Sequence, residues 1–381
     1  MKKKIIRVST VPVSLKNFLH GQLKWLSTYF EIVAVSSPGE ALEVVREREG
    51  VRTVSVPMER RISIVKDLIS LFRMIILFTK ERPYIVHSMT PKAGLISMLA
   101  AWITRVPVRM HTFTGLVFPT ERGIKQRVLI WMDRLTCWCA TYINPEGNGV
   151  KKDLERFHIT HKPLHIVANG NVRGVDMDWY ARTEDVMKMA EPLRKKDCFT
   201  FCFVGRLVKD KGINELVRAF VKLNEEKKET RLFLIGPFED GLDKVDNSVK
   251  DLIINHRSIF SYGKQDDVRG FLAASDVFVL PSYREGFPNG VLEAGALGLP
   301  CIVTNINGCN EIVEDGVNGG VIPPKNEVAL YEKMRYYVEC PDYVSHLAEY
   351  ARDLIMHRYD RKIVWDALLR EYQNLLNNKN K

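Results

Sequence analysis

Two successive series of short apolar runs, each alternating with helical stretches, constrain the fold of this chain more than any other feature. In the first series, strand-like runs occupy residues 4–9, 31–36, 84–87 and 108–112, and helical stretches occupy residues 18–28, 61–79 and 94–103. Parallel strands need a crossover connection, and a helix usually provides it. This order therefore predicts a parallel, doubly wound sheet.

The same order begins again after a loop-rich stretch at residues 165–197, where asparagines and glycines mark turns. Strand-like runs then follow at 199–204, 231–235, 259–262, 277–280 and 301–304, with helices at 212–224 and 267–274. An amphipathic helix is expected at 361–377. The sequence predicts an α/β protein of two Rossmann-like domains that face a cleft. The domains are expected at residues 1–170 and 171–359, the second including a linker at 171–197.

Charge is distributed unevenly between the two predicted domains. The 381-residue chain has a net charge of +10, yet residues 1–170 carry 26 Lys and Arg against 13 Asp and Glu, whereas residues 171–381 carry 30 against 33. The first domain is thus strongly basic, which indicates an anionic partner. Nucleic acid is disfavoured because no nucleic-acid module or basic-aromatic stripe is recognisable. An anionic membrane surface is the favoured partner.

Cysteine usage and hydropathy indicate a cytoplasmic protein. Seven cysteines, an odd number without regular spacing, argue against both a disulfide framework and a zinc site. No signal peptide is recognisable at residues 1–9, and no uninterrupted apolar run approaches the ~20 residues that a bilayer-spanning helix needs. No metal site and no cofactor are expected.

The segment at residues 282–300, SYREGFPNGVLEAGALGLP, contains two carboxylates eight positions apart, Glu285 and Glu293. Glycines and Pro288 form a tight loop, and Asn289 is expected to be the N-cap of a helix at 291–297. The first amides of such a helix are unpaired and attract anions. A carboxylate can accept hydrogen bonds from both hydroxyls of a vicinal diol. A site that binds two diols and a diphosphate suits a sugar nucleotide, although two surface glutamates beside an ordinary helix would look similar.

The segment at residues 204–212, VGRLVKDKG, places Arg206 and Lys211 at the carboxyl end of a predicted parallel strand. Ligands bind at this edge in open α/β sheets. Two cations there would neutralise a departing diphosphate by electrostatics alone. The alternative is a solvated basic loop.

Together the two segments resemble the signature of the family-4 retaining glycosyltransferases, which have the GT-B fold and use nucleotide-sugar donors. The resemblance implies that Glu285 contacts the donor hexose, that Glu293 binds the ribose, and that Arg206 and Lys211 bind the pyrophosphate. Backbone contacts near the hexose would come from Phe287, Pro288 and Asn289, and the nucleobase would lie near Gly263 and Lys264.

Within that family the chain is similar to a bacterial subgroup that builds capsules, O-antigens and lipid-linked oligosaccharides. The resemblance implies that the loop at residues 111–115, HTFTG, reaches the donor sugar, which makes His111 a candidate catalytic residue beside Glu285. The N-terminal loop at residues 10–17 lacks the paired glycines of many relatives. Ser14, Asn17 and, further on, Gly21 are its candidate acceptor or phosphate contacts. The C-terminal helix, at about 360–381, is expected to return to the first, acceptor-binding domain.

The sequence therefore predicts a retaining, metal-independent transfer of a hexose or N-acetylhexosamine from a nucleotide sugar, UDP-linked by preference, to a polyprenyl-diphosphate-linked glycan. An NAD-dependent oxidoreductase is disfavoured because no G-x-G-x-x-G follows either opening strand. A sugar-nucleotide sensor without catalytic activity is the other alternative. The sugar, the linkage, the acceptor and the oligomeric state stay open.

We also expect peripheral attachment to the inner face of the cytoplasmic membrane. The helix at 61–79 is mostly apolar, so it is either buried in the domain or presented to lipid. Burial is the favoured alternative, with basic loops at residues 59–61 and 121–127 making the contact.

Overall fold

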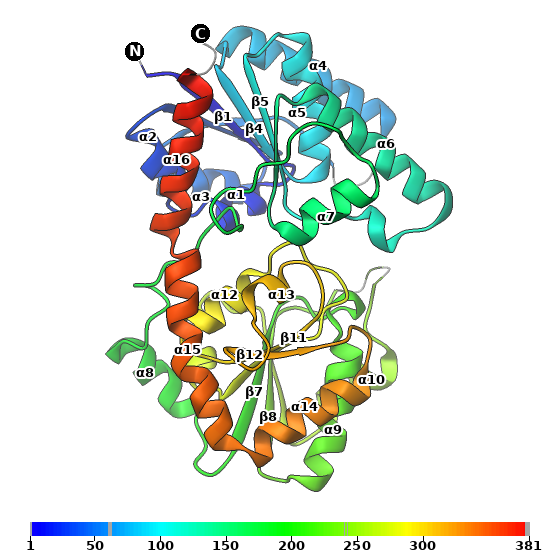
Figure 1. Cartoon of the computed structure of the whole chain (residues 1–381), viewed down its shortest axis with the longest axis vertical. Helices are drawn as coiled ribbons and strands as arrows, with labels where there is room; N and C mark the ends of the chain where they lie inside the picture. Colours follow the sequence, from blue (N-terminus) through cyan, green and yellow to red (C-terminus); the bar gives the residue numbers. More distant parts are fainter. Residues whose placement is uncertain (1, 60–62, 240, 242, 378–381) are drawn as a thin grey trace. The chain divides into compact units, whose positions relative to one another are not determined.

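The structure is a computed structural model that describes residues 2–59, 63–239, 241 and 243–377 (Figure 1). It divides into two compact units. The first unit comprises residues up to Gly174 together with the C-terminal residues from Lys362 onward, and the second runs from Val175 to Arg361. Each unit contains one six-stranded parallel sheet, so both predicted Rossmann-like domains are confirmed.

The sheet of the first unit has the strand order β3-β2-β1-β4-β5-β6. Helices cover both faces of this sheet, so its central strands β1 and β4 are buried on both sides, including the polar residues Arg7, His87 and Ser88. In β1, Ile5 and Ile6 point to opposite faces and are both fully buried. The strands are β1 (Lys4–Val8), β2 (Glu31–Ser36), β3 (Arg52–Ser55), β4 (Ile85–Met89), β5 (Val108–Phe113) and β6 (Tyr142–Pro145).

Two helical layers cover the two faces of this sheet, each with its own hydrophobic core. One layer contains α1 (Pro12–Phe18), α2 (Gln22–Ser27), α3 (Glu40–Glu49) and α16 (Arg361–Asn377). The other contains α4 (Ile64–Glu81), α5 (Pro91–Ile103), α6 (Gly123–Cys139) and α7 (Asn148–Arg156), with the 3-10 turn η1 (Phe118–Thr120) before α6. Helix α5 packs against both α4 and α6, as Figure 1 shows.

The sheet of the second unit has the order β12-β11-β10-β7-β8-β9. Its strands are β7 (Phe199–Val204), β8 (Thr230–Ile235), β9 (Ile259–Gly263), β10 (Val277–Leu280), β11 (Cys301–Thr304) and β12 (Gly319–Ile322). Its helices are α8 (Glu184–Ala190), α9 (Ile213–Glu226), α10 (Asn247–Asn255), α11 (Arg269–Ala273), α12 (Asn289–Ala296), α13 (Cys309–Ile312), α14 (Glu327–Glu339) and α15 (Pro341–Tyr359), with 3-10 turns η2 (Glu191–Leu193) and η3 (Lys209–Lys211). Helix α9 packs against α14, and α12 packs against α15.

The last helix, α16, packs on the first unit, which confirms its expected return to the first domain. Trp365 donates a hydrogen bond of 2.8 Å from Nε1 to the carbonyl oxygen of Arg173. Further along, the Tyr372 hydroxyl lies 3.1 Å from Nη1 of Arg7 and 2.5 Å from Nδ1 of His87, and all three residues are buried. Apolar packing and a buried polar cluster therefore both hold the helix in place.

Some local predictions for the first unit are wrong. The stretch at residues 10–17, expected to be a loop, contains helix α1, which begins with Pro12 at its first turn. Proline suits that position because its missing N–H would be unpaired there in any case. The apolar helix expected at 61–79 is α4, and it is only partly buried. Met74 and Phe78 face the core, whereas six large apolar residues are exposed: Ile64, Val65, Leu68, Ile69, Phe72 and Ile76. Of the basic loop expected at 59–61, Arg60 and Arg61 lie outside the described residues.

Within the described part of the chain, no helix is both long enough and apolar enough to cross a membrane.

Candidate active site

The second sheet has a switch point between β7 and β10, and this point marks the candidate site. From β7 the chain continues outward through β8 to β9, and it then returns to place β10 on the other side of β7. Ligands bind outside the carboxyl ends of the strands at such a point. The loop after β7 carries Arg206 and Lys211, and the loop after β10 carries Glu285. The two motifs found in the sequence therefore meet in space.

Close backbone contacts at glycines bring the loops of this edge together. A Cβ atom on Gly212 would lie 2.1 Å from a carbonyl oxygen of the β10 loop, and one on Gly308 would lie 2.3 Å from another. On Gly236 it would lie 1.8 Å from the carbonyl oxygen of Gly205. All three positions have a positive φ, of 71°, 74° and 146° respectively. Only glycine suits both the conformation and the space, so these residues set the spacing of the loops.

Two side chains hold Glu285 in place. Its Oε1 forms an ion pair with Nζ of Lys211 and accepts a hydrogen bond of 2.8 Å from Oγ of Ser282. The side chains of Lys211 and Glu285 are only 21% and 12% exposed. Burial and, to a smaller extent, the charge of Glu285 raise the pKa of the Cys309 thiol. A fixed and partly desolvated carboxylate beside an ammonium can orient a sugar hydroxyl next to a phosphate.

Arg206 has a more open environment. Its Nη1 lies 2.7 Å from Oε2 of Glu239, and the two side chains are 52% and 45% exposed. The next residue, Leu207, donates a 2.9 Å hydrogen bond to the carbonyl oxygen of Pro237 and so ties the β7 loop to the β8 loop. An exposed ion pair contributes at most about 1 kcal/mol. The guanidinium can therefore exchange Glu239 for phosphate oxygens at low cost.

A second set of contacts, which sequence reasoning missed, joins the same two loops. Arg284 Nη2 lies 2.9 Å from Oδ2 of Asp210, and the backbone N–H of Tyr283 donates to the carbonyl oxygen of Asp210 at 2.8 Å. The Tyr283 hydroxyl donates a 2.5 Å hydrogen bond to Glu215. Burial, and then Glu215, raise the pKa of Tyr283, so it stays a donor. These partners lie 68 to 74 residues apart in the chain, so no local sequence pattern predicts the contacts between them.

Helix α12 begins at Asn289, so this asparagine is the first helical residue and not the N-cap. Pro288 is the N-cap, with an extended backbone, and Asn289 is already helical, so the prediction of Asn289 as the N-cap is wrong. The Pro288 carbonyl accepts from the backbone N–H of Val291 at 3.2 Å. Phe287 is 5% exposed and packs edge-on against Tyr359, with ring centroids 5.4 Å apart. Near the middle of α12, Glu293 is half-buried.

The predicted nucleobase position lies further along the same edge of the sheet. Gly263 ends β9 with a positive φ of 62°, and its carbonyl oxygen accepts a 2.8 Å hydrogen bond from the N–H of Gly236. Lys264, the next residue, is exposed. The described loops therefore form one row that runs from Gly308 past Glu285 and Lys211 to Gly263.

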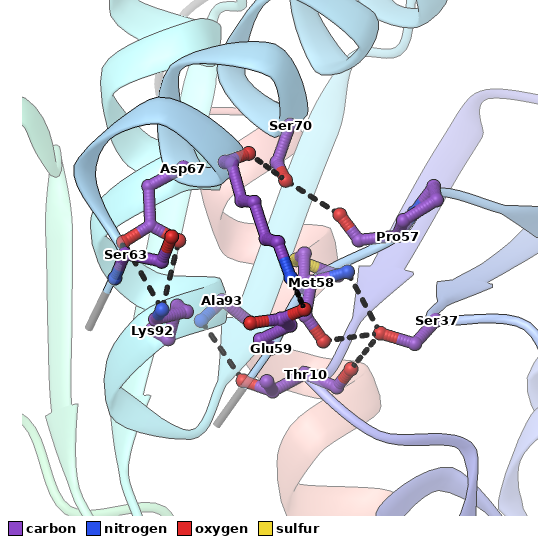
Figure 2. A network of polar contacts seen from close by, with 11 residues as sticks. Thr10, Ser37, Pro57, Met58, Glu59, Ser63, Asp67, Ser70, Lys92 and Ala93 are labelled. Atoms are coloured by element: carbon purple, nitrogen blue, oxygen red, sulfur yellow. Dashed lines mark hydrogen bonds and ion pairs between the residues drawn. The ribbon is translucent and has the colours of Figure 1, made fainter. Parts of the chain in front are cut away.

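The first unit has a switch point of its own, between β1 and β4. The hydroxyls of Thr10 and Thr90, which follow these two strands, lie 2.8 Å apart, and Thr90 also accepts from the backbone N–H of Thr10 at 3.1 Å. Thr10 in turn accepts from the N–H of Ala93 at 3.1 Å (Figure 2). Thr90 has a φ of 75°, which is unfavourable for a β-branched residue. Such strain clusters at functional sites, although neither threonine was among the site residues predicted from the sequence.

The polar network around Thr10 extends to the neighbouring loops (Figure 2). Ser37 Oγ lies 2.7 Å from the carbonyl oxygen of Thr10 and 2.6 Å from that of Met58. On α4, Ser70 Oγ lies 2.5 Å from the carbonyl oxygen of Pro57. The network therefore fixes the loops after β1, β2 and β3 and the first half of α4 relative to each other.

His111 lies inside β5 and not in the loop that follows it, so its predicted placement after the strand is wrong. Its side chain is 1% exposed, Nδ1 lies 2.8 Å from Oγ of Ser88, and its ring packs edge-on against Phe113 at 4.5 Å. Burial lowers the pKa of His111 to about 3, so the ring is neutral near pH 7. Sequence reasoning also missed His87, a buried neighbour whose Nε2 lies 2.7 Å from Oγ1 of Thr112.

The three N-terminal candidates do not form a common loop. Ser14 and Asn17 lie on α1, which replaces the expected loop. Gly21 is the N-cap of α2 with a φ of 75°, and its N–H donates to Oε1 of Glu49 at 2.9 Å. A Cβ atom there would lie 3.2 Å from the ring of Trp365. The close packing of α2 against α16 therefore explains why a glycine occupies position 21.

No group of three or more His, Cys, Asp or Glu side chains among the described residues is placed to hold a metal ion.

Comparison with known proteins shows to which family the chain belongs. Residues 27–170 match the model of the glycosyl transferase 4-like domain, and residues 187–354 match that of the glycosyl transferases group 1. The chain belongs to the family-4 glycosyltransferases, enzymes with the GT-B fold.

Two relatives show the similarity along the chain. A capsular polysaccharide biosynthesis glycosyltransferase of Staphylococcus aureus, CapM, is 31% identical over 378 residues, which is 98% of each chain. A UDP-Gal:alpha-D-GlcNAc-diphosphoundecaprenol alpha-1,3-galactosyltransferase of Escherichia coli is 32% identical over 281 residues, 72% of this chain and 71% of that one.

A solved structure shares the fold. The Anabaena protein HepE, crystallised with UDP and glucose, has a TM-score of 0.83 at 16% identity and covers 98% of this chain and 100% of its own.

Proposed function

We propose that the protein moves a hexose or N-acetylhexosamine from a UDP-sugar to a polyprenyl-diphosphate-linked glycan, with retention of anomeric configuration and without a metal ion. The product would be a lipid-linked intermediate of a cell-surface polysaccharide. The donor would bind in the second unit, and the first unit would offer the acceptor hydroxyl.

The observation that carries this proposal is the row of loops along the carboxyl edge of the second sheet. Glu285 lies toward one end, the cations Lys211 and Arg206 follow in the β7 loop, and Gly263 lies at the other end. A nucleotide sugar has its groups in the same order: hexose, diphosphate, ribose and base. Glu293, on the helix that follows the β10 loop, would accept hydrogen bonds from the ribose hydroxyls.

The two cations would replace a metal in stabilising the departing diphosphate. Negative charge develops on the β-phosphate as the bond between C1 of the sugar and the phosphate oxygen breaks. Lys211 would stabilise it from a partly buried position, where electrostatic interactions are stronger than in water. Arg206, released from Glu239, would add a planar pair of donors.

Anomeric configuration would be retained because the acceptor hydroxyl attacks C1 of the sugar from the same face that the diphosphate leaves. A bond would form between the acceptor oxygen and C1 as the bond from C1 to phosphate breaks, and the acceptor proton would pass to the departing phosphate oxygen. Glu285 would orient the hexose for this step, because Lys211 and Ser282 hold its carboxylate.

The proposed acceptor class and location draw on relatives. The E. coli relative's name specifies a diphosphoundecaprenol acceptor, and that of a Campylobacter jejuni relative, 29% identical over 175 residues, specifies a diphospho-undecaprenol acceptor. A polyprenyl chain of this kind lies in a bilayer. The enzyme would therefore work as a peripheral protein at the inner face of the cytoplasmic membrane.

The direct test is transfer by the purified protein. A panel of UDP-, GDP- and dTDP-sugars would be incubated with N-acetylglucosamine-diphosphate-undecaprenol or a short-chain analogue, and the product linkage read by NMR. We expect an α-linked product from one UDP-α-sugar, at the same rate with and without EDTA. A β-linked product would contradict retention, and loss of activity in EDTA that magnesium restores would contradict the metal-free scheme. Binding of UDP-sugars without transfer to any acceptor would favour the sugar-nucleotide sensor.

A further inference from the structure

The outer face of α4 is apolar although it is exposed to solvent. Its six large apolar side chains recur at positions that lie on one side of a helix, and each is at least about half exposed. They are Ile64 (75%), Val65 (70%), Leu68 (59%), Ile69 (49%), Phe72 (64%) and Ile76 (52%). Scattered surface apolar residues are normal in soluble proteins, but a continuous stripe of this kind marks an interaction surface.

The core-facing side of α4 is the opposite one. Ser70, Met74 and Phe78 are buried there. The Ser70 hydroxyl is hydrogen-bonded to the carbonyl oxygen of Pro57 (Figure 2) and also lies 2.8 Å from that of Lys66. Three basic residues, Lys66, Arg73 and Lys80, follow one edge of the apolar stripe at intervals of seven residues. An apolar stripe with a basic border is the pattern of a helix that lies in the plane of a membrane interface.

Helix α6 repeats this arrangement on the same side of the sheet. Ile124 (80%), Val128 (43%), Trp131 (64%) and Trp138 (57%) are exposed, with spacings of four, three and seven residues that place them on one face. Arg127 and Arg134 border this stripe. Near the end of α5, Trp102 is 44% exposed and packs against Trp138, with ring centroids 5.0 Å apart. Exposed tryptophans are typical of membrane interfaces, where an apolar ring and a polar N–H are both accommodated.

The segment that contains α4, α5 and α6 has a strongly one-sided charge. Residues 63–140 contain 11 Lys and Arg against four Asp and Glu. Three of the acids are paired: Asp67 with Lys92, Glu81 with Lys4 and Arg52, and Glu121 with Lys125.

The fourth acid, Asp133, is 9% exposed, and burial raises its pKa to about 7. The described acids of residues 63–140 are therefore paired or buried, and the charge left at the surface of this segment is positive. A second copy of the same face would bring like charges together, whereas an anionic lipid surface is complementary to it.

We propose that the outer face of α4 and α6 is the surface by which this enzyme docks on an anionic lipid bilayer. The α4/α6 face comprises Ile64, Val65, Leu68, Ile69, Phe72, Ile76, Ile124, Val128, Trp131 and Trp138, with the basic borders Lys66, Arg73, Lys80, Arg127 and Arg134. Both helices lie in the interfacial plane, with the apolar stripes among the acyl chains and the basic borders at the lipid phosphates.

This inference rests on the peripheral attachment in the proposed function. The α4/α6 face, rather than the basic loops expected from the sequence, is then the principal contact with the membrane. Its test measures lipid binding and not sugar transfer, so the two can fail separately. Full-length protein would be co-sedimented with vesicles of phosphatidylcholine alone and of phosphatidylcholine with phosphatidylglycerol in equal amounts. We expect binding to the anionic vesicles, with weaker binding as salt is raised, because the lipid–cation attraction is screened.

Two double variants separate the apolar and the electrostatic contributions. Leu68→Gln/Phe72→Gln should lower the partition coefficient on anionic vesicles by on the order of tenfold or more, because two large side chains no longer enter the apolar layer. Ile254→Gln/Val328→Gln, at similarly exposed positions of the second unit (66% and 60%), is the matched control and should bind like wild type. Arg73→Gln/Lys80→Gln should weaken binding and reduce its salt dependence, whereas Lys24→Gln/Lys152→Gln should not.

The outcomes are distinct. Unchanged binding of Leu68→Gln/Phe72→Gln would overturn the assignment of this face, as would equal binding of wild type to neutral and anionic vesicles. If wild type binds neither vesicle and the apolar variant changes only the oligomeric state in light scattering, the face is a protein interface. Transfer to a water-soluble acceptor analogue should be the same in wild type and Leu68→Gln/Phe72→Gln. Loss of transfer in wild type as well would implicate the proposed function and not the docking face.

Discussion

At the scale of single residues, the contact between Lys211 and Glu285 connects the two motifs of the candidate site. Both side chains are largely shielded from water, and each is expected to contact the donor. We expect Lys211→Ala to lower kcat/KM by about 10²-fold, the effect of removing one donor to a developing negative charge. Lys209→Ala is the matched control, since Lys209 lies in the same loop with a side chain that is 52% exposed. UDP release would be measured for both.

A double-mutant cycle tests whether the pair works as a unit. The loss in Lys211→Ala/Glu285→Ala should be smaller than the sum of the two single losses, because residues in direct contact are not independent. Additive losses would show that the ion pair has no part in catalysis.

The two glutamates should differ in which kinetic constant they affect. Glu293→Ala removes the expected ribose acceptor, a contact made in both ground and transition states, so KM for the donor should rise with little change in kcat. Glu285→Ala should lower kcat instead, because the hexose loses its alignment. Initial rates across donor concentrations would separate the two. A rise in KM alone for Glu285→Ala would remove its proposed orienting role.

Asp133 makes stability dependent on pH. Burial raises its pKa to about 7, whereas in the unfolded chain the pKa is about 4. Between these values the folded protein holds a proton that the unfolded chain has lost, so stability falls as pH rises, by at most about 1.4 kcal/mol per pH unit. Asp133→Asn should therefore raise the thermal midpoint more at pH 8 than at pH 5. Asp251→Asn, at an exposed position, should show no such difference; equal gains for Asp133→Asn at both pH values would contradict the buried, protonated carboxyl.

At the scale of elements, α16 depends on a polar cluster as well as on its apolar face. Tyr372→Phe keeps the ring but removes the hydroxyl shared by His87 and Arg7, all of them buried. Leaving such groups unpaired costs about 1–3 kcal/mol. We expect a lower urea midpoint and faster hydrogen exchange in α16. Tyr29→Phe, at a side chain that is 45% exposed, is the control; a Tyr372→Phe midpoint equal to wild type would show that the hydroxyl is dispensable.

The elements that sequence analysis located best are the central strands. The runs at 199–204, 277–280 and 301–304 match β7, β10 and β11 residue for residue, because strands buried on both faces are continuous apolar runs with sharp ends. Helix α1 was missed because its seven residues are too few to show a helical period. Strand β3 was missed because it is a partly exposed edge strand with polar residues.

Helix α4 shows what periodicity leaves undetermined. The pattern located the helix but not the side that packs on the sheet. The core accepts the small Ser70, which finds partners in Pro57 and Lys66, while Phe72 and five other large residues stay outside. Which side is buried depends on contacts with loops distant in sequence, so only the structure decides it.

For the candidate site, too, the sequence predicted the principal residues but not the contacts that support them. Local motifs identified Glu285, Lys211 and Arg206, because loops that follow parallel strands share one edge of a sheet. The supporting contacts, such as Arg284 with Asp210, join segments that are 74 residues apart and have no local signature. The threonine pair at the first switch point was missed for the same reason.

At the scale of the whole molecule, the two compact units should respond differently to the donor nucleotide. The donor contacts named in the proposed function come from the second unit, and the glycine-rich loops that carry most of them are held to one another by backbone contacts. UDP at a hundred times its Kd should stabilise the state that binds it by about 2.7 kcal/mol.

Hydrogen exchange with and without UDP would test this directly. We expect slower exchange at residues 205–212, 236–239 and 281–293, because the nucleotide restrains these loops and stabilises the second unit. Helices α4 and α6, on the first unit, should exchange at unchanged rates, since the α4/α6 face is assigned to lipid and not to the donor. UMP, which lacks the β-phosphate, is the matched control and should protect residues 205–212 less than UDP does. Protection by UDP that is confined to the first unit would reverse the proposed roles of the two units, because the donor would then bind where the acceptor is expected.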